Sequence, residues 1–264
     1  PDFAERMARG EANVLLLVDG SSSFTSQSAY NTANAISQQY AVSLILTRGG
    51  SPVSTHLQIL YNPDLKDVWF ITPAFIAMLL QVLAERLTAF AIVREREMGT
   101  IEALLVTPIR PVELMIAKMI PNMVLAFSSA FSMLIVGALI FGVPFRGSVL
   151  LFFGLALINV GCGLSLGLML SSAVQTQNQA QQLDSMVSMS GMFLAGVFFP
   201  TYALPWILRA LSFLFPMTYF IPILRGIALK GLGFADLWPQ ALALVIFLVV
   251  TLFITTRLFR PSLD

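Results

Sequence analysis

The chain of 264 residues is 57% hydrophobic and only 11% charged, with a mean hydropathy of +0.82. Soluble domains carry about 25% charged residues, so much of the apolar surface here has to face lipid. The 15 Lys and Arg against 14 Asp and Glu give a formal net charge of +1, which excludes a basic field for binding nucleic acid. One cysteine, Cys162, excludes an internal disulfide, and with one histidine, His56, no Cys/His cluster for zinc can form.

Residues 1–67 are predicted to form a small water-soluble α/β domain, because charged residues and serines concentrate there. The patterns predict a buried strand over 13–18, a helix over 25–40 and a second strand over 57–61, before the turn signal Asn62-Pro63. The serines after Gly20 lack the G-x-x-x-x-G-K-[ST] order of a P-loop, which occurs nowhere in the chain. The chain begins at Pro1 without an initiator Met or an apolar leader, so we expect a truncated start.

Residues 68–264 are predicted to be a transmembrane domain of about five helical spans. Each span approaches the roughly 20 apolar residues that cross a bilayer, and lipid leaves a backbone no partner outside its own helix. The predicted spans are 68–93, 114–141, 149–170, 184–199 and 239–256. Between the last two, residues 201–238 are apolar but contain Pro205, Pro216 and Pro222. We expect short, broken helices there that dip into the membrane from one side.

Charge placement predicts the orientation of these spans. Arg94, Arg96 and Arg110 follow the first span, and Arg257 and Arg260 follow the fifth, which predicts that these ends are cytoplasmic. The N-terminal domain and the broken helices then lie on the outer side, although Arg209, Arg225 and Lys230 run against the rule there. An exported domain needs an earlier span to carry it outward, so we expect about six spans in the full protein.

The stretch 94–108 between the first two spans is amphipathic. Met98, Ile101 and Leu105 share one helical face, and Pro108 and Pro111 end this helix and begin the next span. Such a helix would lie in the cytoplasmic interface. The alternative from periodicity alone is a connector with snorkelling charges.

Two motifs resemble one family. The string EREMGTIEALLVTPIRPVELMIAK, residues 95–118, resembles the cytoplasmic loop of multidrug-type, type 2 ATP-binding-cassette (ABC) exporter permeases, with its E-x-G-T-x-E-x-L-x-x-T-P pattern. The stretch 190–231 is similar to the C-terminal pattern of that family, with a G-x-x-F-P, a leucine-proline and a late Arg-Gly. The resemblance covers nearly the whole chain.

The resemblance implies a permease subunit of an exporter in the bacterial inner (cytoplasmic) membrane. A second permease chain, identical or paralogous, would pair with it to enclose a path, and separate ABC ATPase subunits would dock on the cytoplasmic helix. ATP and Mg would bind to the ATPase, so the resemblance implies no cofactor and no catalysis in this chain. The implied ATPase-coupling residues are Glu95, Glu97, Gly99, Thr100, Glu102, Leu105, Thr107 and Pro108.

Ionisable groups at membrane depth are candidates for function. Glu85 and Arg86 are expected to snorkel or to pair with neighbours on the loop that follows the first span, with a role in transport as the alternative. Asp184 is expected to cap the fourth span. Met186, Met189 and Met192 repeat on one helical face and suit either packing or a varied apolar ligand. The candidate translocation path comprises Met186, Met189, Met192, Pro200, Pro216 and Arg225. In the third span, Gly161, Gly163 and Gly167 suit close helix contact.

Two other classes remain as alternatives. An ion-coupled secondary transporter would be expected to carry Gly/Pro-broken spans in an inverted repeat, and no such repeat is evident. A membrane-embedded hydrolase needs a nucleophile beside a base, but His56 precedes the spans and Cys162 has no partner in the sequence pattern. The substrate stays open among apolar drugs, lipids, peptides and polymers.

Overall fold

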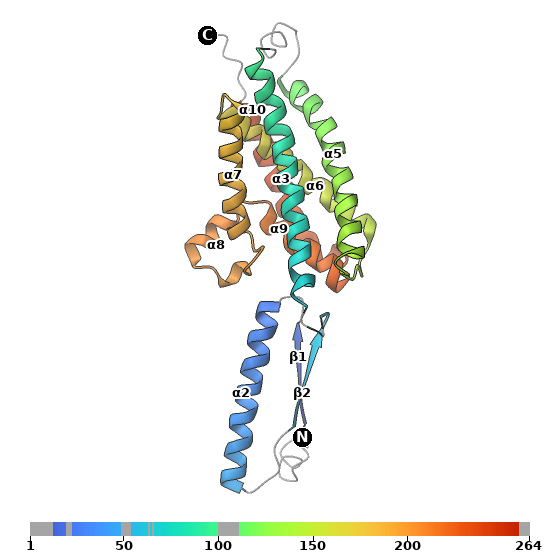
Figure 1. Ribbon diagram of the computed structural model, residues 1–264, viewed down its shortest axis with the longest axis vertical. Coiled ribbons are helices and arrows are strands. Elements are labelled where there is room, and N and C mark those ends of the chain that lie inside the picture. The colour runs from blue at the N-terminus through green and yellow to red at the C-terminus, as the bar shows by residue number, and fades with distance from the viewer. Residues whose placement is uncertain are drawn as a thin grey trace. The chain divides into compact units, whose positions relative to one another are not determined.

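The structure is a computed structural model that describes residues 13–19, 23–48, 54–62, 64, 66–99 and 111–258. The chain divides into two compact units, Pro1–Phe70 and Ile71–Asp264. Figure 1 labels their elements.

The first unit is a parallel β-α-β arrangement. Strand β1 (Asn13–Asp19) pairs in parallel with β2 (Ser54–Leu60), with Asn13 opposite Ser54 and Asp19 opposite Leu60. The connecting helix α2 (Ser23–Arg48) is eight residues longer at its end than predicted. The reason is that the apolar residues after Tyr40 continue the helix until Gly49, the first breaker in the sequence.

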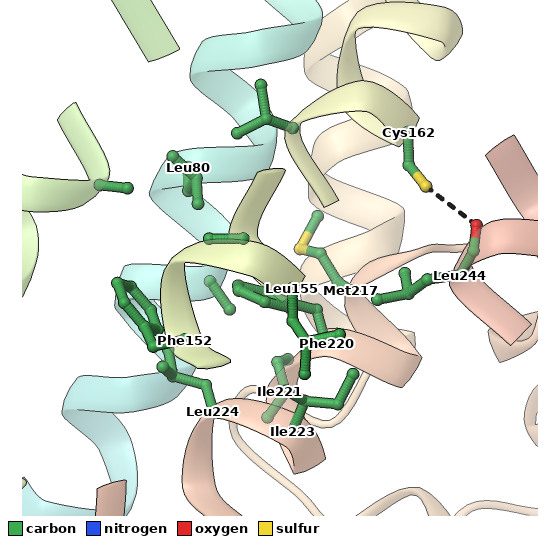
Figure 2. Packing of buried hydrophobic residues seen from close by; sticks show 14 of the residues in the cluster. Leu80, Phe152, Leu155, Cys162, Met217, Phe220, Ile221, Ile223, Leu224 and Leu244 are labelled. Atoms are coloured by element: carbon green, nitrogen blue, oxygen red, sulfur yellow. Dashed lines mark hydrogen bonds between the residues drawn. The ribbon is translucent and has the colours of Figure 1, made fainter. Parts of the chain in front are cut away.

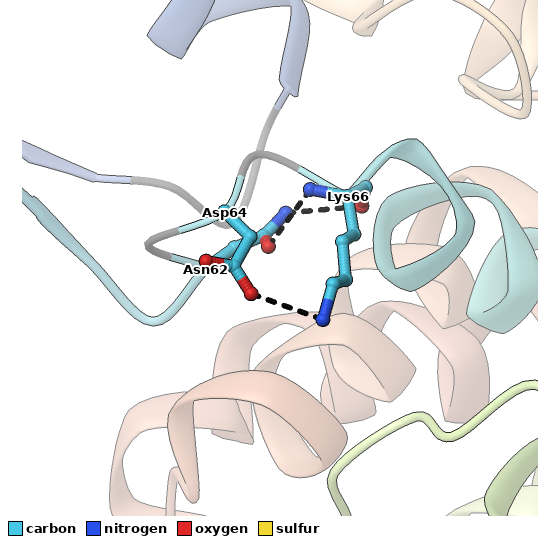
Figure 3. Close-up of polar contacts among 3 residues, drawn as sticks. All are labelled: Asn62, Asp64 and Lys66. Carbon is cyan, nitrogen blue, oxygen red and sulfur yellow. Dashed lines mark hydrogen bonds and ion pairs between the residues drawn. The ribbon is translucent and has the colours of Figure 1, made fainter.

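A compact turn closes this unit. The side chain of Asn62 donates from Nδ2 to the carbonyl of Lys66 and accepts from its backbone N–H, each at 3.0 Å. The ammonium of Lys66 lies 3.0 Å from a carboxylate oxygen of Asp64 (Figure 3) and 5.1 Å from the ring centre of Trp69. The side chain of Asn62 therefore gives the backbone N–H and C=O of Lys66 hydrogen-bond partners within this turn.

The second unit is a helical bundle. Its long helices are α3 (Asp67–Glu97, which begins within the first unit), α5 (Pro111–Leu139), α6 (Val149–Ser172), α7 (Gln177–Leu194) and α10 (Phe234–Leu258). Within the described residues, four helices are long and apolar enough to cross a membrane: Asp67–Glu97, Met119–Leu139, Val149–Ser172 and Phe234–Arg257. They correspond to the first, second, third and fifth predicted spans.

The fourth predicted span, 184–199, is wrong in its bounds. Helix α7 begins seven residues earlier, at Gln177, and ends at Leu194; Gly196 follows with φ +91°, in the left-handed region. Its glutamine-rich first half keeps α7 out of the set of span-length apolar helices. Its 18 residues nevertheless extend about 27 Å at 1.5 Å per residue, close to the thickness of a bilayer's hydrocarbon core.

The segment between α7 and α10 is broken into short helices, as predicted. These are η1 (Thr201–Ala203), α8 (Trp206–Ser212), α9 (Met217–Arg225) and the π-helical turn η2 (Gly226–Lys230). The axis bends by 85° between α8 and the α9–η2 helix, after Pro216, which precedes α9. Proline fixes its own φ and lacks an N–H donor, so it favours such a restart.

The apolar core of the bundle is built around α6 and α9. Figure 2 shows Phe152 and Leu155 of α6 against Phe220 and Ile223 of α9, and all four are buried. In the same view, the thiol of Cys162 donates to the carbonyl of Leu244 in α10 at 3.3 Å. Helix α9, which begins after the break at Pro216, thus buries most of its residues in protein, the condition under which irregular backbone is tolerated at membrane depth.

Small residues let α3 and α6 approach closely. A Cβ at Gly163 would lie 2.7 Å from the Cβ of Ala84, and one at Gly167 would overlap the carbonyl oxygen of Glu85. Both glycines therefore serve the close contact that was predicted for the third span. Gly161 instead faces Leu248 of α10.

Candidate functional site

The last turn of α3 is bonded to the turn between α6 and α7. The guanidinium of Arg96 donates from Nη1 to the carbonyls of Ser171, at 3.0 Å, and Val174, at 2.6 Å. The carboxylate of Glu97 accepts from the backbone N–H of Gln177 at 2.7 Å and from its side-chain Nε2 at 2.6 Å. A cation therefore meets the carbonyl end of α6 and an anion meets the amide end of α7, the arrangement that helix dipoles favour.

Helix α10 shares this end of the bundle. Cys162 contacts Leu244 and Ser165 contacts Thr251, at 2.7 Å between hydroxyl oxygens, so α10 runs parallel to α6. The last turn of α10, with Arg257, therefore lies towards the end where α6 stops. The basic ends of the first and fifth predicted spans thus share one end of the bundle.

The predicted ATPase-coupling residues fall only partly on described structure. Glu95 and Glu97 lie in the last turn of α3, and Gly99 follows with φ +68°, where glycine carries no strain. Thr100, Glu102, Leu105, Thr107 and Pro108 lie outside the described residues, as do Ile101 and Arg110. The structure places the beginning of the predicted coupling segment directly beside α6 and α7.

Further along, α3 meets α7 through a polar seam formed by Gln81, Glu85, Arg86, Asp184 and Ser188. Arg86 Nε donates to Asp184 Oδ2 at 2.7 Å. The carboxylate of Glu85 accepts from Gln81 Nε2 at 2.8 Å and from the Ser188 hydroxyl at 3.3 Å. Structural pairing of Glu85 and Arg86 was predicted and is found, but the partners are not on the loop: Gln81 lies on α3 itself, and Asp184 and Ser188 lie on α7.

Asp184 does not cap a helix. Thr176 is the N-cap of α7, and its hydroxyl accepts from the backbone N–H of Gln179, so Asp184 lies two turns inside the helix. The capping prediction is wrong because the polar run before Asp184 is itself helical. Within the described residues, no donor reaches the second oxygen of Asp184 or the side-chain oxygen of Gln81. A buried polar atom without a hydrogen bond costs about 1–3 kcal/mol, so these two oxygens make the seam a costly contact between α3 and α7.

The outward face of α7 is polar and methionine-bearing. Ala180, Asp184, Ser188 and Gly191 form the buried stripe of this helix. The other side of the same helix exposes five residues: Asn178, Gln181, Gln182, Ser185 and Met186. Of the predicted methionine stripe, Met186 and Met189 are exposed, whereas Met192 packs against the apolar core.

The remaining predicted path residues are largely enclosed. Pro200 and Pro216 are buried. The Arg225 guanidinium donates to the carbonyls of Gly196 and Val197, at 3.3 and 3.4 Å. Arg225 thereby ties the end of α9 to the turn that follows α7.

Sequence reasoning singled out Glu97 but missed Gln177, its partner 80 residues away. It also missed Gln81 and Ser188 in the polar seam. The available signal was the high density of side-chain amides in residues 175–182. A segment that only led into a membrane span would not need so many polar side chains, so the run indicated polar contacts with another part of the chain. For chemistry, no group of three or more His, Cys, Asp or Glu side chains within the described residues is placed to hold a metal ion.

These features define a multi-pass helical membrane protein whose polar groups join helices to one another. The chain matches the family described as "ABC-2 family transporter protein" over residues 3–257, and it belongs to that family. It is a transport subunit of the permease type.

Among curated relatives, the chain is 30% identical over 267 residues to the "Probable multidrug ABC transporter permease YbhR" of Escherichia coli, covering 98% of this chain and 71% of the relative. It is 31% identical over 194 residues to the "Inner membrane transport permease YhhJ" of the same species, covering 73% of this chain and 52% of the relative. It is 25% identical over 208 residues to "ABC transporter G family member 20" of Dictyostelium discoideum, covering 77% of this chain and 28% of that protein.

Proposed function

We propose that this chain is the membrane permease subunit of an ATP-driven exporter, and that it forms the translocation path with a second permease chain. The observation that carries the proposal is the outward face of α7, where Asn178, Gln181 and Gln182 precede the exposed Met186 and Met189. Polar side chains at membrane depth are costly against lipid and usually face protein or a water-filled cavity. A second chain across this face would cover it and enclose a path between the two.

The orientation proposed is that the basic end of the bundle is cytoplasmic and that α8 and α9 lie on the outer side. Positive residues concentrate on the cytoplasmic side of membrane proteins, and Arg94, Arg96 and Arg257 share one end of the bundle. The β-α-β unit of residues 13–60 would then be extracytoplasmic. For a bacterial chain, the membrane would be the inner one, as the name of the relative YhhJ suggests for that protein.

The energy source proposed is a separate ABC ATPase subunit that binds ATP and Mg and docks on the segment after Gly99. Glu95, Glu97 and the coupling residues outside the described structure, Thr100, Glu102, Leu105, Thr107 and Pro108, would form or support that contact. The support is the family to which the chain belongs, together with the position of Glu95 and Glu97 at the basic end of α3. ATP-driven closure of the ATPases would shift the pair of permeases between inward and outward states.

The cargo proposed is an apolar or amphipathic small molecule, because the exposed methionines of α7 are flexible and polarizable and suit varied apolar ligands. The relative YbhR carries the description of a probable multidrug permease. Met186 and Met189 would contact the cargo. The other candidate path residues would support the wall of the path without contacting the cargo, because they are packed or hydrogen-bonded within the chain: Met192, Pro200, Pro216 and Arg225.

The test uses this chain, its second permease and an ATPase encoded beside it, reconstituted into vesicles with the ATPase facing outward. ATP-dependent uptake of the lipophilic aromatic cation ethidium is measured for the native protein and for the double variant Met186→Ala with Met189→Ala. The expected result is a several-fold change in uptake by the double variant. The matched control, Ile246→Ala with Val249→Ala on the exposed side of α10, should transport normally. Equal uptake by both double variants would contradict the proposed path.

A further inference from the structure

We infer that Arg96 and Glu97 are positioning residues that make the end of α3 and the beginning of α7 move as one body when the ATPase acts. The inference rests on the proposed function and adds the route within this chain. The contacts of Arg96 with Ser171 and Val174, and of Glu97 with Gln177, together form an "α3 clamp".

The α3 clamp holds both helices that meet at the α6–α7 turn. Each of its two side chains makes two hydrogen bonds, between 2.6 and 3.0 Å long, to groups at helix ends. Charge-assisted bonds of this length are roughly twice as strong as neutral ones. Because the side chains are adjacent on the last turn of α3, displacement of that turn pulls on the end of α6 and the start of α7 together.

An apolar cluster lies beneath the clamp and stiffens it. Val93 of α3, Val174 of the turn and Ala180 of α7 are buried against one another, with Phe90 and Leu183 packed on them. Only residues 173–176 separate α6 from α7, and so short a connection leaves little slack. The start of α7 therefore has to move together with the end of α3.

The clamp is a property of particular residues and not of a basic helix end in general. Arg94 lies in the same turn, is exposed, and makes no side-chain hydrogen bond to α6 or α7 within the described structure. Arg94 thus supplies positive charge without tying helices together. This difference provides a matched control for the removal of Arg96.

The clamp links the coupling segment to the proposed path through one helix. The segment after Gly99 is where the ATPase is proposed to act, and α7 carries the exposed Met186 and Met189. Both oxygens of Glu97 are engaged by Gln177, so its carboxylate acts within the chain. A movement received beyond Gly99 would pass through the clamp to α7 and change the exposure of its outward face.

The first experiment measures how the solvent exposure of α7 changes with nucleotide, and it needs no transported substrate. In a Cys162→Ala background, a cysteine replaces Ser190, which is exposed on α7, and its rate of reaction with a maleimide is measured in the complex with the ATPase. The rate with ATP and vanadate is compared with the rate without nucleotide. We expect the rate to change at least threefold in the parent, to change less than 1.5-fold with Arg96→Ala or Glu97→Ala, and to respond normally with Arg94→Ala.

The second experiment restores the link by other means. Glu97→Cys with Gln177→Cys should lose most ATP-dependent ethidium uptake, and joining the two cysteines with a short bis-methanethiosulfonate linker should recover at least half of it. Size-exclusion chromatography with the ATPase checks that each variant still assembles. A parent without any nucleotide response would overturn both the proposed function and this inference. A full response in assembled Glu97→Ala, or no recovery after linking, would overturn the inference alone.

Discussion

Replacing Gly163 by alanine tests the close approach of α3 and α6 on which the bundle depends. The added Cβ would lie 2.7 Å from the Cβ of Ala84, against 3.4 Å where ordinary contact begins, and 3.1 Å from the carbonyl oxygen of Gln81. Neither neighbour can rotate away, because one is an alanine methyl and the other is helix backbone. The helices must therefore separate by a substantial fraction of that 0.7 Å shortfall, and overpacking of this kind costs about 1–3 kcal/mol.

Gly154 is the matched control, since it lies in the same helix and a Cβ there meets nothing within 4 Å. Both variants exchange a helical glycine for alanine, so the intrinsic preference of alanine for a helix, about 1 kcal/mol, cancels between them. The difference in their free energies of unfolding isolates the steric clash. It is measured by equilibrium titration with SDS in mixed micelles, followed by circular dichroism. Gly163→Ala should be less stable than Gly154→Ala by about 1–3 kcal/mol, and a difference within about 0.5 kcal/mol would refute the packing argument.

Two further predictions concern the polar seam and the orientation. Arg86→Gln leaves the fully buried Asp184 carboxylate without its cation and should destabilise the protein by about 1–3 kcal/mol in the same titration, whereas Arg94→Gln should leave stability unchanged; equal effects would show that the pair contributes nothing. In intact cells, a cysteine at the exposed Ser28 should react with a membrane-impermeant thiol reagent and one at the exposed Met98 should not; labelling at Met98 would reverse the proposed orientation.

The membrane-spanning helices were largely predictable because lipid imposes a strong compositional demand. Runs of about 20 apolar residues fixed four spans to within a few residues, and Pro205, Pro216 and Pro222 predicted the broken segment. The fourth span was misplaced because its helix starts in a glutamine-rich run that composition alone assigns to a loop. A helix that is covered by protein on one side and faces a partner or water on the other need not be apolar throughout.

The contacts at the candidate site were less predictable. Glu97 was evident in its motif, but its bond to Gln177 depends on how α3, α6 and α7 pack, and 80 residues separate the two side chains. Asp184 was assigned a cap because a carboxylate near a helix start usually serves that role. The true start, at Thr176, left Asp184 facing Arg86 instead. Local patterns identify which side chains are unusual, and tertiary packing decides their partners.

The central claim is that this chain works in transport driven by ATP hydrolysis on a separate subunit. The most direct measurement is ethidium uptake by vesicles that contain the permease pair and the ATPase, with ATP supplied and all ion gradients collapsed by ionophores. The account predicts that uptake persists under these conditions and stops when the P-loop lysine of the ATPase is replaced by alanine. Uptake that requires a sodium or proton gradient and continues with the inactive ATPase would contradict it and would favour an ion-coupled secondary transporter.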